Sequence, residues 1–98
     1  MSRIQIIRDL MRNTGNEKLL YFLFPDADII DDYGGSAMDL ERINHDIGAF
    51  SSGEQILCRV AMDIWGEYGN VKIFDICRRL DGNNFLAVIK ALVEFRKL

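Results

Sequence analysis

Residues 51–66, SSGEQILCRVAMDIWG, contain the clearest helix signal in the chain. Ser51 and Glu54 match a capping box, in which the serine hydroxyl accepts from the Glu54 amide and the Glu54 carboxylate reaches back to the serine backbone. The apolar residues that follow share one helical face: Ile56, Leu57, Val60, Ala61, Ile64 and Trp65. This pattern predicts a helix that starts at Ser51 and ends at Gly66 or Gly69.

Helical periodicity also dominates the N-terminal half. Residues 4–11 have one apolar face and stop at Asn13-Thr14-Gly15, and Ser36 begins a further helix that ends at Gly48. In the segment of residues 17–24, residues 19–24 are apolar without a break, so their period does not separate helix from strand. We favour a short helix capped by Asn16 and keep a strand at residues 19–24 as the alternative.

Two further helices are predicted after residue 70. The first has its apolar residues between Ile73 and Leu80, and the second runs over residues 84–97, after a turn at residues 81–83. The chain is therefore expected to be all-α: a compact bundle of five or six short helices that forms a single domain over residues 1–98.

The last predicted helix is apolar nearly all round. Its apolar residues are Phe85, Leu86, Ala87, Val88, Ile89, Ala91, Leu92, Val93 and Phe95. A helix with this pattern is either central in its own bundle or shared with a second subunit. The sequence leaves both positions open, and the second implies self-association through the C-terminal helix.

The formal net charge of −3 is unevenly distributed, because residues 17–54 hold nine acidic and two basic side chains, a net charge of −7. This part disfavours contact with phosphate backbones and anionic membranes. The clearest loop, at residues 25–35, lies within it and mixes carboxylates with apolar anchors. We predict a binding site for an unknown protein partner there, formed by Asp26, Asp28, Ile29, Ile30, Asp31, Asp32 and Tyr33.

No pattern in the sequence predicts catalysis, a cofactor or a metal ion. The acidic loop departs from a calcium-binding loop at three positions, and a single histidine, His45, excludes zinc sites built on two imidazoles. His45 has polar neighbours and is expected at the surface. Cys58 and Cys77 form no CxxC motif and lie in apolar segments, so both are predicted to be reduced and buried. Buried thiols in apolar surroundings are inert, which disfavours a Cys–His nucleophile.

A helix, a tight turn and a second helix also form the unit with which many regulators read DNA. Residues 71–80, VKIFDICRRL, resemble the first helix of winged helix-turn-helix regulators, and this resemblance implies DNA binding through residues 71–97. The helix that follows is, however, much more apolar than one that reads base edges. Nucleic acid is therefore the alternative partner and not the leading one.

The sequence thus predicts a non-enzymatic protein-interaction module, such as an adaptor, regulator or inhibitor. No apolar run approaches the 18 or more residues of a membrane-spanning helix, and the N-terminal residues lack the apolar core of a secretory signal. We therefore expect a cytoplasmic protein that makes no use of a membrane.

Overall fold

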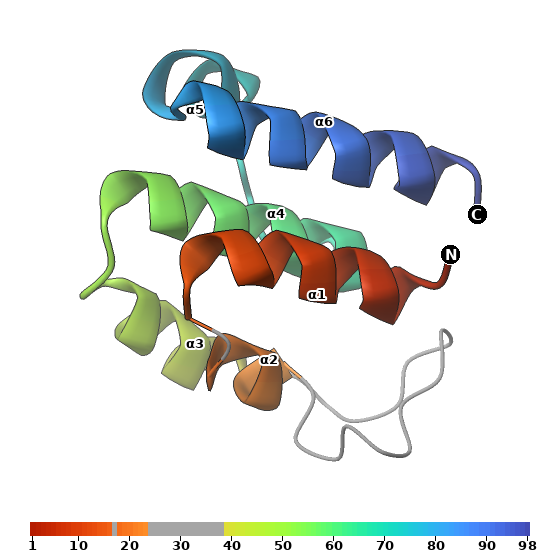
Figure 1. Ribbon diagram of the computed structural model, residues 1–98. Helices are drawn as coiled ribbons and strands as arrows, with labels where there is room; N and C mark the ends of the chain where they lie inside the picture. Colours follow the sequence, from red (N-terminus) through yellow and green to blue (C-terminus); the bar gives the residue numbers. More distant parts are fainter. Residues whose placement is uncertain (17, 24–38) are drawn as a thin grey trace.

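The computed structural model describes residues 1–16, 18–23 and 39–98. Over these residues the chain forms six helices and no strand (Figure 1). The helices are α1 Arg3–Thr14, α2 Lys18–Leu23, α3 Leu40–Ile47, α4 Ser52–Gly66, α5 Ile73–Arg79 and α6 Gly82–Arg96. The predicted all-α bundle of short helices is confirmed.

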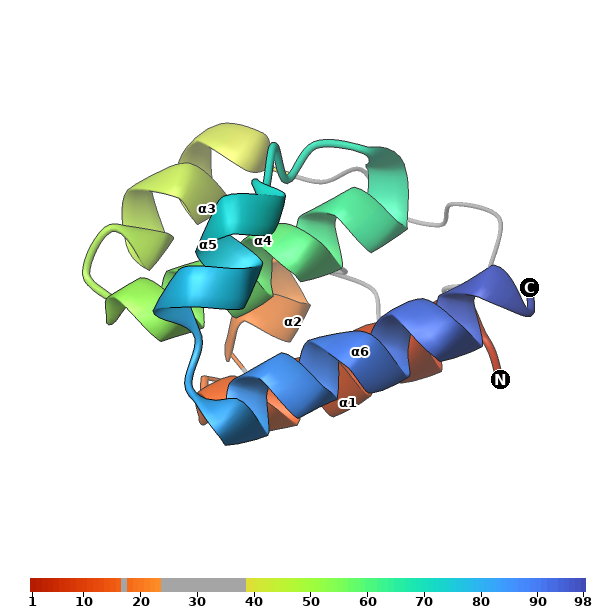
Figure 2. The same ribbon diagram turned by 90° about the horizontal axis from the view of Figure 1, so that it is seen from above.

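The helices stack in three layers (Figures 1 and 2). The middle layer contains α1 and α4, which pack against each other. One side of it is covered by α2 and α3, and the other side by α5 and α6. Because the middle layer is covered on both sides, its two helices can bury side chains in more directions than the outer helices can.

The hydrophobic core follows this layering. The buried apolar side chains of the middle layer are Ile6, Ile7, Leu10 and Met11 of α1, and Ile56, Leu57, Cys58, Val60, Ala61, Met62 and Ile64 of α4. The outer layers add Leu19 and Leu23 of α2, Ile43 and Ile47 of α3, and Val88 and Ala91 of α6. The helix predicted from residues 51–66 is therefore the centre of the fold.

The capping box at the start of α4 forms as predicted. The Ser51 hydroxyl accepts from the Glu54 amide at 3.3 Å, and the Glu54 carboxylate accepts from the Ser51 amide at 3.3 Å. The helix ends at Gly66, one of the two predicted ends, and Glu67 follows in a left-handed conformation with φ of +67°. Its amide donates to the carbonyl of Asp63 and closes the last turn.

Two other helix starts differ from the expected positions. α6 begins at Gly82, two residues early, because the Asp81 carboxylate accepts the amide of Asn84 at 2.8 Å. α3 has Asp39 as its N-cap, and the expected start at Ser36 lies outside the described residues.

The continuous apolar segment near residue 20 is a helix. Lys18–Leu23 forms α2, so the strand alternative is wrong over the part of the segment that the structure describes. Leu19 and Leu23 are four residues apart, which places both on one helical face, and both are buried. Residue 24 lies outside the described residues.

Asp63 organises the link from α4 to α5. Its carboxylate accepts three successive backbone amides, from Gly69 at 2.7 Å, Asn70 at 3.2 Å and Val71 at 3.4 Å. A Cβ atom on residue 69 would overlap the carbonyl of Arg59, so glycine is the residue that fits there. This link sets the point at which the chain enters the layer of α5 and α6.

Candidate interaction surface

The inner face of α6 packs on the middle layer. Val88 and Ala91 are buried, and Ala87 and Phe95 are partly buried against the core. Positions 87, 88, 91 and 95 lie on one side of a helix. The sequence leaves two positions open for this helix, one of them the centre of the bundle. In the structure α4 occupies the centre, and α6 lies in an outer layer.

The opposite side of α6 carries large apolar side chains that the rest of the bundle leaves uncovered. Leu86, Ile89, Leu92 and Val93 are exposed by 58, 39, 43 and 49%, respectively. Leu86, Ile89 and Val93 follow the i, i+3, i+7 spacing, so they form one stripe along the helix. We refer to these three residues as the α6 stripe.

The sequence identifies α6 as apolar without identifying the side that meets solvent. One signal could have done so. Ala87 and Ala91 are small and four residues apart, a spacing that lets two helices approach closely and marks the packed side. The α6 stripe then falls on the opposite side of the helix.

α5 extends this uncovered apolar surface. None of its residues is buried, and Ile73 and Phe74 are exposed by 79 and 63%. α5 contacts α6, and the two helices lie together at the surface that faces the viewer in Figure 2. We refer to Ile73, Phe74, Leu92 and the α6 stripe together as the α5–α6 face.

The two cysteines differ, which corrects part of the prediction. Cys58 of α4 is buried, and desolvation, followed by the charge of Glu54, raises the pKa of its thiol to about 12. Cys77 of α5 is exposed, so the expectation of a buried thiol is wrong for this residue. Only Ile76 and Leu80 of its apolar neighbours pack against the core, and the side of α5 that holds Cys77 faces outward.

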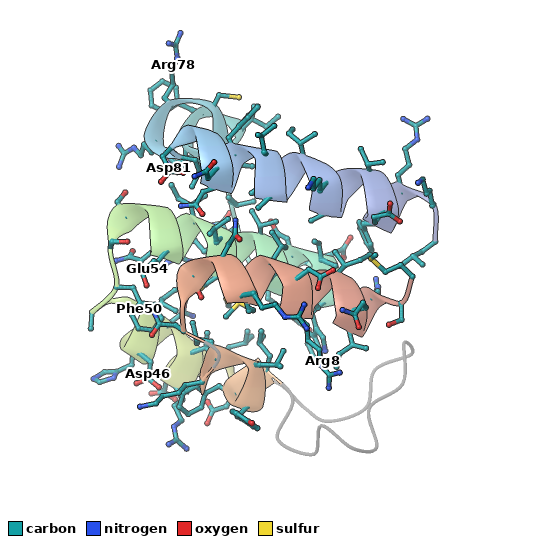
Figure 3. The ribbon with its side chains drawn as sticks, viewed as in Figure 1. Arg8, Asp46, Phe50, Glu54, Arg78 and Asp81 are labelled. Atoms are coloured by element: carbon teal, nitrogen blue, oxygen red, sulfur yellow. The ribbon has the colours of Figure 1, made fainter. Side chains whose placement is uncertain are left out.

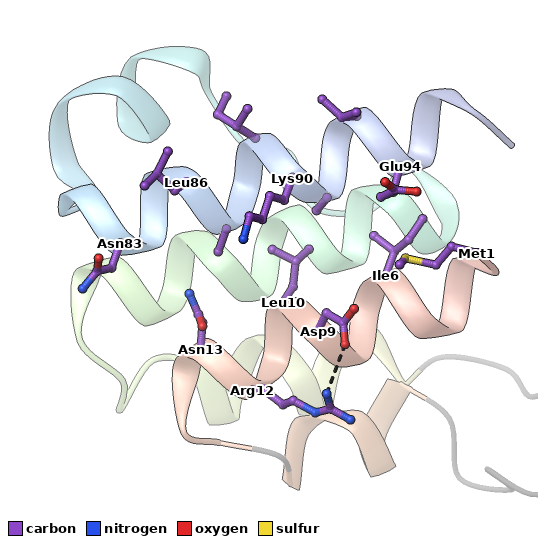
Figure 4. A pocket seen from close by; sticks show the side chains of 14 residues that line it. Met1, Ile6, Asp9, Leu10, Arg12, Asn13, Asn83, Leu86, Lys90 and Glu94 are labelled. Carbon is purple, nitrogen blue, oxygen red and sulfur yellow. Dashed lines mark hydrogen bonds and ion pairs between the residues drawn. The ribbon is translucent and has the colours of Figure 1, made fainter.

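A groove of about 900 Å³ lies between α1 and α6 (Figure 4). Ile6, Leu10 and Ala91 contribute apolar surface, and all three residues of the α6 stripe line the groove as well. Its charged lining residues are two acids and two bases: Asp9, Arg12, Lys90 and Glu94. The groove therefore combines an apolar lining with a balanced set of charges.

Opposite charges lie at the two ends of α6. Asp81 caps the N-terminal end, whereas Arg96 and Lys97 lie at the C-terminal end, where Lys97 pairs with Glu94 at 3.2 Å. Lys90 lies between the two ends and makes no hydrogen bond or ion pair with any residue that the structure describes. α6 itself thus begins at an acidic residue and ends at basic ones, and Arg78 of α5 lies near its acidic end.

The other residues that the sequence singles out provide less evidence for a functional site. The acidic-loop site at residues 26–33 lies outside the described residues and stays a prediction. His45 is exposed as expected, and its Nδ1 lies 3.4 Å from the Asp46 carboxylate. Within residues 1–16, 18–23 and 39–98, no three His, Cys, Asp or Glu side chains are placed to hold a metal ion.

α5 and α6 are consecutive helices joined by a short link, as a helix-turn-helix unit requires. The second helix of such a unit enters the DNA groove, but here that helix exposes the α6 stripe. On α5, Arg78 projects away from the bundle (Figure 3), whereas Arg79 pairs with Asp75 at 3.1 Å. Of the six basic side chains in residues 71–97, two are ion-paired, so the apolar α6 stripe, and not a lack of cations, argues against DNA reading by α6.

Comparison of the chain with protein-family models, with curated proteins and with solved structures found no match. None of the helices in the described part of the chain has the length and hydrophobicity that crossing a membrane requires. The function is therefore inferred from the surface itself.

Proposed function

We propose that this chain is a non-enzymatic protein-interaction module, an adaptor, regulator or inhibitor, that binds its partner through the α5–α6 face. One observation carries the proposal. Six large apolar side chains on two adjacent helices are each exposed by 39% or more. Large apolar side chains left exposed on two contacting helices of a small protein favour a binding surface, because leaving them in water is unfavourable.

The chemistry of the face favours a protein over nucleic acid. Helices that read DNA present polar and basic side chains to base edges and phosphates. The α6 stripe presents branched aliphatic side chains, with Lys90 beside it. Aliphatic surface with a polar rim is the composition of protein interfaces. DNA binding through residues 71–97 is the weaker alternative.

The cysteines support a non-enzymatic role and an intracellular setting. A thiol whose pKa is raised to about 12 is a poor nucleophile at neutral pH, which argues against Cys58 as a catalytic group. Both cysteines are free thiols, the state typical of the reducing cytoplasm. The exposed Cys77 lies on α5, next to the proposed binding face.

The proposal is tested by affinity capture from the host's own lysate with tagged native protein and the Leu86→Glu/Val93→Glu variant. Tyr21→Glu is the matched control, because Tyr21 on α2 is an apolar side chain of similar exposure outside the α5–α6 face. A protein retained by the native and Tyr21→Glu baits and lost by the double variant is the expected result. Equal capture by all three baits, or recovery of nucleic acid alone, would overturn the proposal.

A fourth bait tests the acidic loop separately. Replacing Asp26, Asp28, Asp31 and Asp32 with Asn removes four charges and leaves the α5–α6 face intact. Loss of a captured protein with this bait alone would assign that protein to the loop.

A further inference from the structure

We infer that the α5–α6 face binds a second copy of the chain, with the two α6 helices antiparallel and Ile89 close to the two-fold axis. This inference rests on the proposed function, because it names the partner of the same face. Three observations carry it: the spacing of the α6 stripe, the charges at the ends of α6, and the size of the face.

The α6 stripe has the spacing of a helix that pairs with another helix. Leu86, Ile89 and Val93 recur at intervals of three and four residues, the pattern that forms a seam between paired helices. A two-fold interface uses the same patch on both copies, so each residue of the patch must find a suitable partner within that patch. A stripe made only of aliphatic side chains meets this condition.

The charges at the two ends of α6 itself favour the antiparallel direction. Asp81 lies at one end of α6 and Arg96 and Lys97 lie at the other. Antiparallel pairing places the acid of each copy near the bases of its partner, twice by symmetry, whereas parallel pairing brings like charges together at both ends. The helix macrodipoles favour the same direction.

The same arrangement fixes a register. When Ile89 lies opposite Ile89 of the second copy, Asp81 lies opposite Lys97 and Leu86 lies opposite Leu92 and Val93. The apolar residues and the end charges therefore agree on one alignment. The balanced charges of the adjacent groove, two acids and two bases, suit a second copy better than a strongly charged partner.

The face is large enough for a dimer. A standard interface buries about 800 Å² on each partner, which is about an eighth of the 6246 Å² surface of this chain. The molecule measures 36 × 31 × 21 Å, and α6, with 15 residues, is about 22 Å long. With α5 beside it, one face of the molecule has room for the required area.

Sedimentation equilibrium of the native chain gives the first test. We expect a monomer–dimer equilibrium that Leu86→Glu/Val93→Glu weakens by about 30-fold or more, because two buried aliphatic contacts become carboxylates, and that Tyr21→Glu leaves unchanged. Circular dichroism confirms that each variant is folded. A native chain that stays monomeric up to millimolar concentration would overturn the inference.

Cysteine cross-linking tests the register. In a Cys77→Ser background, Ile89→Cys is expected to form a disulfide-linked dimer under mild oxidation. Leu86→Cys alone is expected not to, because the two copies of residue 86 are offset by six positions, about 9 Å along the helices, beyond the Cα separation that a disulfide spans. A mixture of Leu86→Cys and Val93→Cys chains is expected to link as a heterodimer. Self-linking of Leu86→Cys as fast as that of Ile89→Cys would overturn the antiparallel register.

The two proposals fail separately. A monomeric native chain whose α5–α6 face still captures another protein contradicts the homodimer and leaves the interaction module standing. A chain whose face captures nothing from the lysate and does not dimerise contradicts both.

Discussion

The two outer layers of the bundle cover opposite sides of the same pair of helices, yet they distribute their apolar side chains differently. α2 and α3, with six and eight residues, contribute four buried side chains. α5 and α6, with seven and fifteen residues, contribute two and leave six large apolar side chains exposed. The shorter pair of helices thus contributes more buried side chains to the hydrophobic core.

The two layers thus differ in whether their apolar side chains are buried in the core or exposed to a partner. The outward positions of α3 hold mainly polar residues, among them Glu41, Asn44 and His45, so the layer of α2 and α3 meets water with suitable side chains on that helix. The outward positions of α6 hold the α6 stripe. An apolar side chain at such a position adds less to the stability of the monomer than a buried one, and it contributes more when a partner covers it.

The largest expected effect is the difference in alkylation rate between the thiol of α5 and the thiol of the core. At pH 8 and high dilution, an alkylating reagent should modify Cys77 at least about a thousandfold faster than Cys58. Burial denies the reagent access to Cys58, and a pKa near 12 lowers its thiolate fraction about a thousandfold from that of an ordinary thiol. Mass spectrometry of native and denatured protein gives the two rates.

The raised thiol pKa also predicts a direction for stability against pH. The unfolded chain ionises Cys58 near its ordinary pKa of 9.0, whereas the folded chain does so near 12, so this residue's contribution is present below pH 9 and is lost as pH rises towards 12. Cys58→Ala should flatten that part of the pH profile. Equal alkylation rates for the two native thiols would contradict both expectations.

The second expected effect compares an inward side chain of α3 with an outward one of α6. Ile43→Ala should lower the free energy of unfolding by about 2–5 kcal/mol, because Ile43 is fully buried between the layers. Ile89→Ala should change it by less than about 1 kcal/mol in dilute, monomeric protein, because water already reaches that side chain. Urea titration measures both.

Measuring these two substitutions at several protein concentrations also tests the proposed dimer. If α6 pairs with a second copy, Ile89→Ala should become more destabilising as the concentration rises, whereas the effect of Ile43→Ala should stay constant. A large loss from Ile89→Ala at high dilution would mean that the α5–α6 layer belongs to the core after all.

The sequence predicts the helices better than their places in the bundle. The capping box at Ser51 and the apolar period that follows it are local signals, and they predict where α4 begins and ends. The predicted turn at residues 81–83 is wrong at its end, because Gly82 and Asn83 already belong to α6. The short helix near residue 20 was ambiguous because a continuous apolar run fits more than one period.

The surface could not be predicted in the same way. Which side of α6 is covered depends on how closely α1 and α4 approach it, which is a long-range property that the period of one helix does not contain. The same limit explains the error at Cys77, which was expected in the core because its apolar neighbours Ile73 and Ile76 share its face in the helical pattern. A short helix in an outer layer buries only some of the side chains that its apolar pattern contains.

The third expected effect concerns the link through which the chain enters the α5–α6 layer. Gly69→Ala should cost about 1–3 kcal/mol, because the added methyl group overlaps the carbonyl of Arg59 and the link must move. Asp63→Asn should cost about 1–2 kcal/mol, because one of the two oxygens that accept the three amides becomes an NH2 donor and the other no longer carries charge. Thermal unfolding measures both, and Gly82→Ala is the control, because a Cβ there meets open space. Equal melting temperatures for Gly69→Ala and Gly82→Ala would contradict this role of the link.

The smallest expected effect concerns the start of α4, which meets the connection between α1 and α2 and also lies close to Leu80 and Asn84, beside the link between α5 and α6. Glu54 completes the capping box with Ser51 and also accepts a hydrogen bond from the side chain of Asn16. Ser51→Ala should lower the free energy of unfolding by about 1 kcal/mol, or about 4–8 °C in melting temperature, because the Glu54 amide loses its acceptor. Ser52→Ala is the matched control one residue later, inside the helix, and should be neutral. Since none of the residues of the box belongs to the α5–α6 face, neither substitution should alter binding through that face. A binding defect in Ser51→Ala at a temperature where it is fully folded would show that the start of α4 and the α5–α6 face are coupled.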